Sequence, residues 1–135
     1  MKRIGVYCGS FDPISAFHIG RIKELIRSRE LDVVYLTALN DGAIADRDER
    51  MALMRILTHP YRKMIVTRQL PALKGCVIVE ITETADEKAV SEYIREGNFR
   101  NMPLKGRCYM ADKGMYIDSL IKHMVSSRRY DHSRR

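Results

Sequence analysis

Apolar positions along the first half of the chain alternate between short continuous runs and longer stretches with helical spacing. The run Val33-Val34-Tyr35-Leu36 has no polar alternation, which is typical of a strand buried on both faces. Ile19, Ile22, Leu25 and Ile26 recur at the 3.6-residue period of an amphipathic helix. The pattern predicts strands at 3–7 and 31–37, helices at 15–29 and 47–58, a turn at 8–14 and a loop at 38–46.

The second half of the chain continues with strand-like runs and two further helices. Residues 63–67 and 76–81 form the apolar runs. Thr84 and Glu87 have capping-box spacing and predict a helix that ends near Glu96, before Gly97. A last helix is expected at about 115–126. Because strands alternate with helices in the first half, the fold class is α/β with a parallel sheet.

The segment between the first strand and the first helix is the strongest indication of function. It reads Gly9-Ser10-Phe11-Asp12-Pro13-Ile14-Ser15-Ala16-Phe17-His18. Free backbone N–H groups and the helix dipole make the start of a helix a site for phosphate. His18 would lie in the first turn, within reach of a polyphosphate, whereas Asp12 is expected to be a turn or cap residue.

This segment also resembles a known protein family. Residues 9–13 resemble the G-[ST]-F-D-P signature of the nucleotidylyltransferase superfamily, and residues 15–18 occupy the [HT]-x-G-H motif that follows it. The last His is kept as His18, the first position is Ser15, and Phe17 replaces the Gly. A gapped alternative places the motif at 18–21, but the ungapped register puts the strand at 32–36 at the family's usual distance. His18 is the His of the site in both registers.

The resemblance implies a Rossmann-like parallel sheet with flanking helices in three layers. The superfamily includes the nicotinate and nicotinamide mononucleotide adenylyltransferases and phosphopantetheine adenylyltransferase. It implies transfer of AMP from ATP to a phosphorylated acceptor in coenzyme biosynthesis, such as NAD biosynthesis, with Mg²⁺ held chiefly by the phosphates. By the same resemblance, His18 and Ser10 are the expected catalytic residues. The residues expected to bind ATP are Gly9, Ser10, Phe11, Ser15, His18 and Arg21, with Lys23 as a further charge partner.

The second signature of the family is degenerate, and its register stays open. In the mononucleotide enzymes it resembles I-S-S-T-x-[IV]-R, but residues 85–91 carry Asp86 and Glu87 at the hydroxyl positions and Ser91 at the Arg position. A register similar to phosphopantetheine adenylyltransferase uses residues 116–122 and gives Ser119 and Lys122 the phosphate role. The resemblance covers 3–57 well and 78–125 loosely, so the acceptor is not assigned.

Composition indicates the domain organisation and cellular compartment, and it adds two further hypotheses about function. The 135 residues are expected to form one domain at 1–126 and a flexible basic tail at 127–135. No apolar stretch has the roughly 20 residues of a membrane span, and three widely spaced cysteines favour a reducing cytoplasm. The degenerate motifs suggest a nucleotide-binding relative without catalysis. The net charge of +7 and the four Arg residues of the tail suggest a nucleic-acid-binding or assembly protein. The family's varied oligomers leave a homo-oligomer open.

Overall fold

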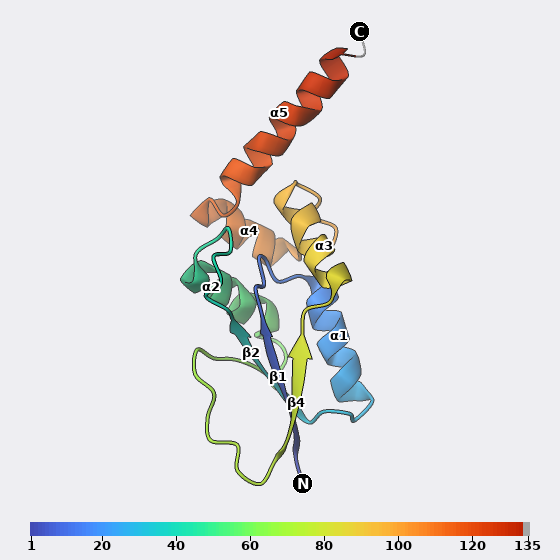
Figure 1. The fold of residues 1–135 in the computed structure, drawn as a ribbon, viewed down its shortest axis with the longest axis vertical. Helices are drawn as coiled ribbons and strands as arrows, with labels where there is room; N and C mark the ends of the chain where they lie inside the picture. The colour runs from blue at the N-terminus through green and yellow to red at the C-terminus, as the bar shows by residue number, and fades with distance from the viewer. Residues whose placement is uncertain (134–135) are drawn as a thin grey trace.

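The computed structural model describes residues 1–133, with side chains described as far as Ser126. Four strands and five helices follow one another as shown in Figure 1. Their bounds are β1 Arg3–Gly9, α1 Ala16–Arg27, β2 Val33–Ala38, α2 Arg47–Thr58, β3 Met64–Val66, β4 Val77–Thr82, α3 Ala85–Arg95, α4 Leu104–Lys113 and α5 Ile117–Ser133. The predicted elements are all present, with ends that differ by no more than about two residues except at α5, and α4 is an additional helix.

All four strands are parallel, and their order in the sheet is β3-β2-β1-β4. The chain therefore adds strands on one side of β1 and then crosses to the other side to place β4. This reversal between β1 and β4 creates a switch point, and Rossmann-like sheets bind their ligands at the carboxyl ends of the strands there. Together with the flanking helices, the sheet confirms the predicted Rossmann-like α/β fold class. Gly9 and Thr82 end the two strands at the switch point.

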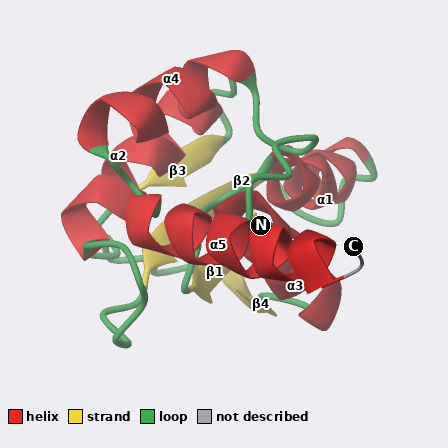
Figure 2. Cartoon of the chain, turned by 90° about the horizontal axis from the view of Figure 1, so that it is seen from above, coloured by secondary structure: helices red, strands yellow, loops and turns green. Residues whose placement is uncertain are grey.

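Helix α4 packs closely against α2, and Figure 2 shows the two together with α1 apart from them. A Cβ at Gly106 would lie 2.5 Å from Met102 Sδ and 2.8 Å from Leu57 Cδ1. Glycine at this position therefore allows the close approach of the two helices. Sequence analysis did not predict α4, because an interior Gly disfavours a helix and its apolar positions form no clear stripe.

Helix α5 begins over the carboxyl ends of the strands and extends away from them (Figures 1 and 2). It is longer than the predicted 115–126 helix and continues to Ser133. No helix in the described part of the chain is long and apolar enough to cross a membrane. The predicted basic tail falls on 127–135, whose side chains lie outside the described ones.

The loops at the carboxyl ends of β1 and β2 are held by one buried arginine. The Arg50 side chain donates to three backbone oxygens, at 2.5 Å to Ser10, 3.0 Å to Leu39 and 2.9 Å to Ala45. Arg50 is only 2% exposed, so its guanidinium depends on these carbonyl oxygens for its hydrogen bonds. One side chain thus fixes the turn after β1 relative to the loop after β2.

Asp12 stabilises the same region as a hydrogen-bond acceptor, whereas Arg50 does so as a donor. Its carboxylate accepts hydrogen bonds from the N–H groups of Ile44 (2.8 Å) and Ala45 (3.2 Å) and from the Tyr116 hydroxyl (2.6 Å). Burial and the neighbouring Asp12 carboxylate raise the pKa of Tyr116, so its hydroxyl stays protonated and donates. Asp12 therefore has the turn-stabilising role that its sequence context predicts.

We expect Arg50→Met to lower the free energy of unfolding by about 3 kcal/mol or more, because three loop carbonyl oxygens lose charge-assisted hydrogen bonds from a buried guanidinium. Urea denaturation of the variant measures this loss. The control is Arg55→Met, which removes an exposed arginine from the same helix and should change stability by less than about 0.5 kcal/mol. Equal stability of the two variants would contradict this account of Arg50.

Candidate functional site

Backbone and imidazole donors converge at the switch point of the sheet. The turn after β1 directs the N–H groups of Ser10 and Phe11 toward the end of β4, and the first turn of α1 directs Nε2 of His18 to the same place. His18 is fully buried, and its ring lies 5.5 Å from the Phe11 ring, centroid to centroid. We call these three donors, Ser10 N–H, Phe11 N–H and His18 Nε2, the cradle.

The carboxylate of Glu83 occupies the cradle. Its Oε1 accepts from Ser10 N–H at 2.5 Å and from Phe11 N–H at 3.3 Å, and its Oε2 lies 2.9 Å from His18 Nε2. Glu83 is the first residue after β4, and its side chain is only 2% exposed. The anion-binding donors predicted from the sequence thus come together, and an acidic side chain of the chain itself satisfies them.

Two further observations show how closely Glu83 fits this position. A Cβ at Gly9 would lie only 2.6 Å from Glu83 Oε1 and 2.7 Å from its Cγ, so only glycine leaves room for the side chain. Burial by itself would raise the pKa of Glu83. The hydrogen bonds from His18 Nε2 and from the N–H groups of Phe11 and Ser10 outweigh burial and hold the pKa of Glu83 below its usual value. At neutral pH the group is therefore an anion.

Ser15 orients the His18 ring from the other side. Ser15 is the N-cap of α1 and forms a capping box with His18, whose Nδ1 lies 3.1 Å from Ser15 N and 2.7 Å from Ser15 Oγ. Because a backbone N–H can only donate, Nδ1 accepts and Nε2–H points to Glu83. The serine, histidine and carboxylate resemble a hydrolase triad in composition. However, Ser15 is fully buried and caps the helix, so its hydroxyl is not accessible to a substrate.

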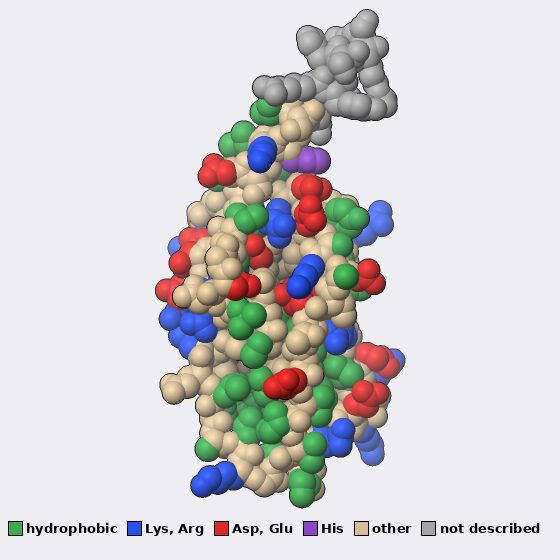
Figure 3. All heavy atoms as spheres, in the orientation of Figure 1, with side chains coloured by type: hydrophobic (Ala, Val, Ile, Leu, Met, Phe, Trp, Pro, Cys, Tyr) green, Lys and Arg blue, Asp and Glu red, His purple; other side chains and the backbone are tan. Residues whose placement is uncertain are grey.

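A cavity of about 460 Å³ adjoins the cradle. Ser10 and Glu83 line one side, and α3 lines the other with Lys88 and Arg95. Arg95 donates to the backbone oxygen of Asp12 at 2.7 Å, which holds its guanidinium against the turn. In Figure 3, charged side chains of both signs gather toward this end of the sheet, above the mainly hydrophobic surface over β4. The cavity has the size of a small-molecule site, and its wall carries the two cations together with the carboxylates of Asp12, Glu83 and Glu92.

Among the residues predicted to bind ATP, Gly9, Ser10, Phe11, Ser15 and His18 lie in or directly behind the cradle. Arg21 instead donates to Glu87 Oε1 and to the backbone oxygen of Thr82, both at 2.8 Å. Ser119 and Lys122 do not line the cavity next to the cradle but a neighbouring hollow between α3 and α5, which shares Glu92 and Arg95 with that cavity. Of the two possible registers of the second signature, the one at residues 85–91 therefore lies nearer to the cradle. The phosphate-binding roles of both segments stay predictions.

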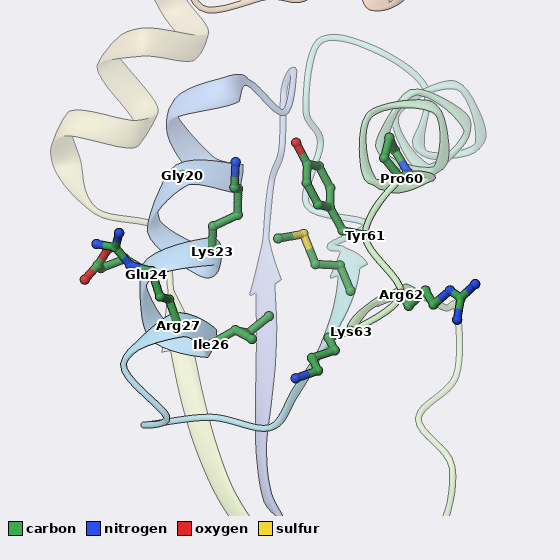
Figure 4. A pocket seen from close by; sticks show the side chains of 10 residues that line it. Gly20, Lys23, Glu24, Ile26, Arg27, Pro60, Tyr61, Arg62 and Lys63 are labelled. Atoms are coloured by element: carbon green, nitrogen blue, oxygen red, sulfur yellow. The ribbon is translucent and has the colours of Figure 1, made fainter.

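Lys23, the further charge partner considered from the sequence, lies away from the cradle. Its ammonium group is 5.2 Å from the centroid of the Tyr61 ring, in a hollow of about 630 Å³ between α1 and the segment before β3. Figure 4 shows Lys23 and Tyr61 side by side in this hollow, with Arg27 and Arg62 pointing away from it. This larger hollow shares no lining residue with the cavity next to the cradle.

Sequence analysis missed Glu83, Lys88 and Arg95 as residues of the site. The only local signal for Glu83 is its place directly after a strand, where α/β sheets put ligand-contacting residues. Lys88 and Arg95 look like ordinary charges on an amphipathic helix. Their relation to the turn at 9–11 depends on contacts across more than 70 residues of chain, such as those between Glu83 and Ser10.

The lowered pKa of Glu83 predicts a pH-dependent contribution to stability. A carboxyl group with a lower pKa in the folded state stabilises the fold above its unfolded pKa, and this contribution is lost as the pH falls through the folded value. We expect Glu83→Gln to be less stable than the wild type at pH 7 by about 1–3 kcal/mol. The difference should shrink as the pH falls below the ordinary value of 4.5.

Urea denaturation of both proteins between pH 7 and pH 3 measures this difference. The matched control is Glu80→Gln, which removes the same charge from an exposed position on β4. A stability difference for Glu83→Gln that did not change with pH would contradict the ionised state of Glu83 in the cradle.

Comparison with known proteins adds no relative at this point. No protein-family model matches the chain, and a search of curated proteins finds no match.

Proposed function

We propose that the chain is a nucleotidylyltransferase-like protein that binds ATP at the cradle and transfers AMP to a phosphorylated acceptor. The observation that carries this proposal is the convergence of Ser10 N–H, Phe11 N–H and His18 Nε2 on one oxyanion at the switch point. Backbone N–H groups in the turn between a strand and a helix are common donors to nucleotide phosphates. The acceptor class stays as the sequence suggests, a mononucleotide or 4′-phosphopantetheine.

The adjoining cavity supports the same proposal. A triphosphate that starts at the cradle would extend toward α3, where Lys88 and Arg95 line the wall. Both side chains are cations that suit phosphate oxygens, and Arg95 is already held in place by the backbone of Asp12. These two residues would supply the phosphate contacts that Asp86, Glu87 and Ser91 no longer provide at the hydroxyl and Arg positions of the signature. Mg²⁺ would enter with the substrate, held chiefly by its phosphates.

The reaction needs alignment and charge neutralisation more than covalent catalysis. An oxygen of the acceptor's phosphate forms a bond to the α-phosphorus of ATP, and the bond to the bridging oxygen breaks, so pyrophosphate leaves with its electron pair. His18 would donate its Nε2 hydrogen bond to the developing negative charge. The two backbone N–H groups would hold a phosphate oxygen in fixed geometry.

A second candidate is a nucleotide-binding protein that no longer catalyses transfer. The occupation of the cradle by Glu83 favours it, because a carboxylate among the phosphate donors opposes a second anion. This candidate predicts ATP binding without release of pyrophosphate.

We expect His18→Ala to lower pyrophosphate release from Mg·ATP by about 100-fold or more, since one pre-oriented donor to the transition state is lost. The assay supplies nicotinate mononucleotide, nicotinamide mononucleotide and 4′-phosphopantetheine in separate reactions. His18→Gln keeps a donor toward Glu83 and controls for the structural role of the ring, and His59→Ala removes an exposed histidine. Full activity in His18→Ala, or no turnover of any acceptor by the wild type, would count against transferase activity.

Lys88→Ala should weaken ATP binding by about tenfold or more, because the variant removes one charge-assisted contact to phosphate. Isothermal titration with ATP measures the change. Lys74→Ala is the matched control, since Lys74 is an exposed lysine in the β3–β4 connection. Equal ATP affinities of the two variants would exclude Lys88 from the binding site.

A further inference from the structure

We propose that Glu83 is a built-in ligand of the cradle, and that a phosphate group binds there only by displacing the Glu83 carboxylate. This inference rests on the proposed function in that both concern the same site. It adds that the site is closed by the chain's own side chain when no nucleotide is bound.

The carboxylate uses the cradle as a phosphate would. Its two oxygens bind different donors, with Oε1 on the N–H groups of Ser10 and Phe11 and Oε2 on His18 Nε2. A phosphate with two oxygens toward the turn would need the same three donors. None of the three has a second acceptor among the described residues, so Glu83 and a phosphate compete for one set of hydrogen bonds.

Space and charge make the competition exclusive. The Glu83 side chain is buried against Gly9, where even a methyl group on the backbone would overlap it. A phosphate at hydrogen-bond distance from the same donors would overlap the carboxylate and meet its negative charge. The two anions therefore cannot occupy the cradle together.

The position of Glu83 in the chain allows its side chain to move out of the cradle. It lies between the end of β4 and Thr84, the N-cap of α3, so it belongs to neither the strand nor the helix. The cavity of about 460 Å³ beside it offers space to a released carboxylate, and its wall carries the cations Lys88 and Arg95 as possible partners, beside the carboxylates of Asp12 and Glu92. Rotation of one side chain is then enough to open the cradle, and the apparent affinity for phosphate falls by the fraction of molecules that are open.

Inorganic tripolyphosphate tests this inference without requiring turnover. Isothermal titration compares its binding to the wild type, Glu83→Gln and the control Glu80→Gln, which changes the net charge equally at an exposed site on β4. In the Glu83→Gln variant, the new amide would turn its N–H₂ group toward the Nε2–H of His18. Two donors would then lie face to face, so the amide competes poorly for the cradle. We expect Glu83→Gln to bind tripolyphosphate at least about tenfold more tightly than the wild type, and Glu80→Gln to match the wild type.

A second variant, Glu83→Asp, keeps the charge but shortens the side chain by one methylene, so it does not reach both sides of the cradle. It should also bind tripolyphosphate more tightly than the wild type, which tests the inference if Glu83→Gln is poorly folded. Equal or weaker binding by the folded Glu83 variants, or an equal gain in Glu80→Gln, overturns the inference.

The outcomes for this inference and for the proposed function are separable. Tighter tripolyphosphate binding by Glu83→Gln, without pyrophosphate release from ATP, supports the built-in ligand and rejects the transferase. The opposite result is also possible: the wild type turns over ATP, and Glu83→Gln binds tripolyphosphate no more tightly than the wild type. That result supports the transferase and rejects the built-in ligand.

Discussion

The interaction between the Glu83 carboxylate and its three donors joins the parts of the molecule on which the site depends. It connects the end of β4 to the turn after β1 and to the first turn of α1. Buried N–H groups and a buried imidazole need a partner, and an ionised carboxylate is the strongest acceptor available in a protein. The same bond therefore stabilises the switch point and occupies its anion-binding donors.

The rest of the carboxyl end is arranged to keep the donors in place. Arg50 supplies hydrogens to three loop carbonyl oxygens, and Asp12 accepts hydrogens from two loop N–H groups and from Tyr116. The buried Arg50 thus satisfies backbone acceptors of the loops, and the buried Asp12 satisfies backbone donors. Their effect is a pre-formed turn, so a ligand that replaced Glu83 would not have to order the backbone.

This arrangement has a cost for any phosphate ligand. The donors are pre-oriented, which favours binding, but an internal carboxylate must be released first, which opposes it. The balance between the two depends on the cavity beside α3, where Lys88 and Arg95 can stabilise either the ligand or the released side chain.

The sequence by itself determined the α/β class, the strand–turn–helix at residues 3–27 and the histidine that points to the end of the sheet. These features depend on local periodicity, capping and turn chemistry, which act over a few residues. Only the tertiary structure decided that Glu83 fills the cradle, that Arg21 binds Glu87, and that α4 forms beside α2. Those contacts join positions about 50 to 70 residues apart, and no pattern within either segment specifies which distant side chain will meet it.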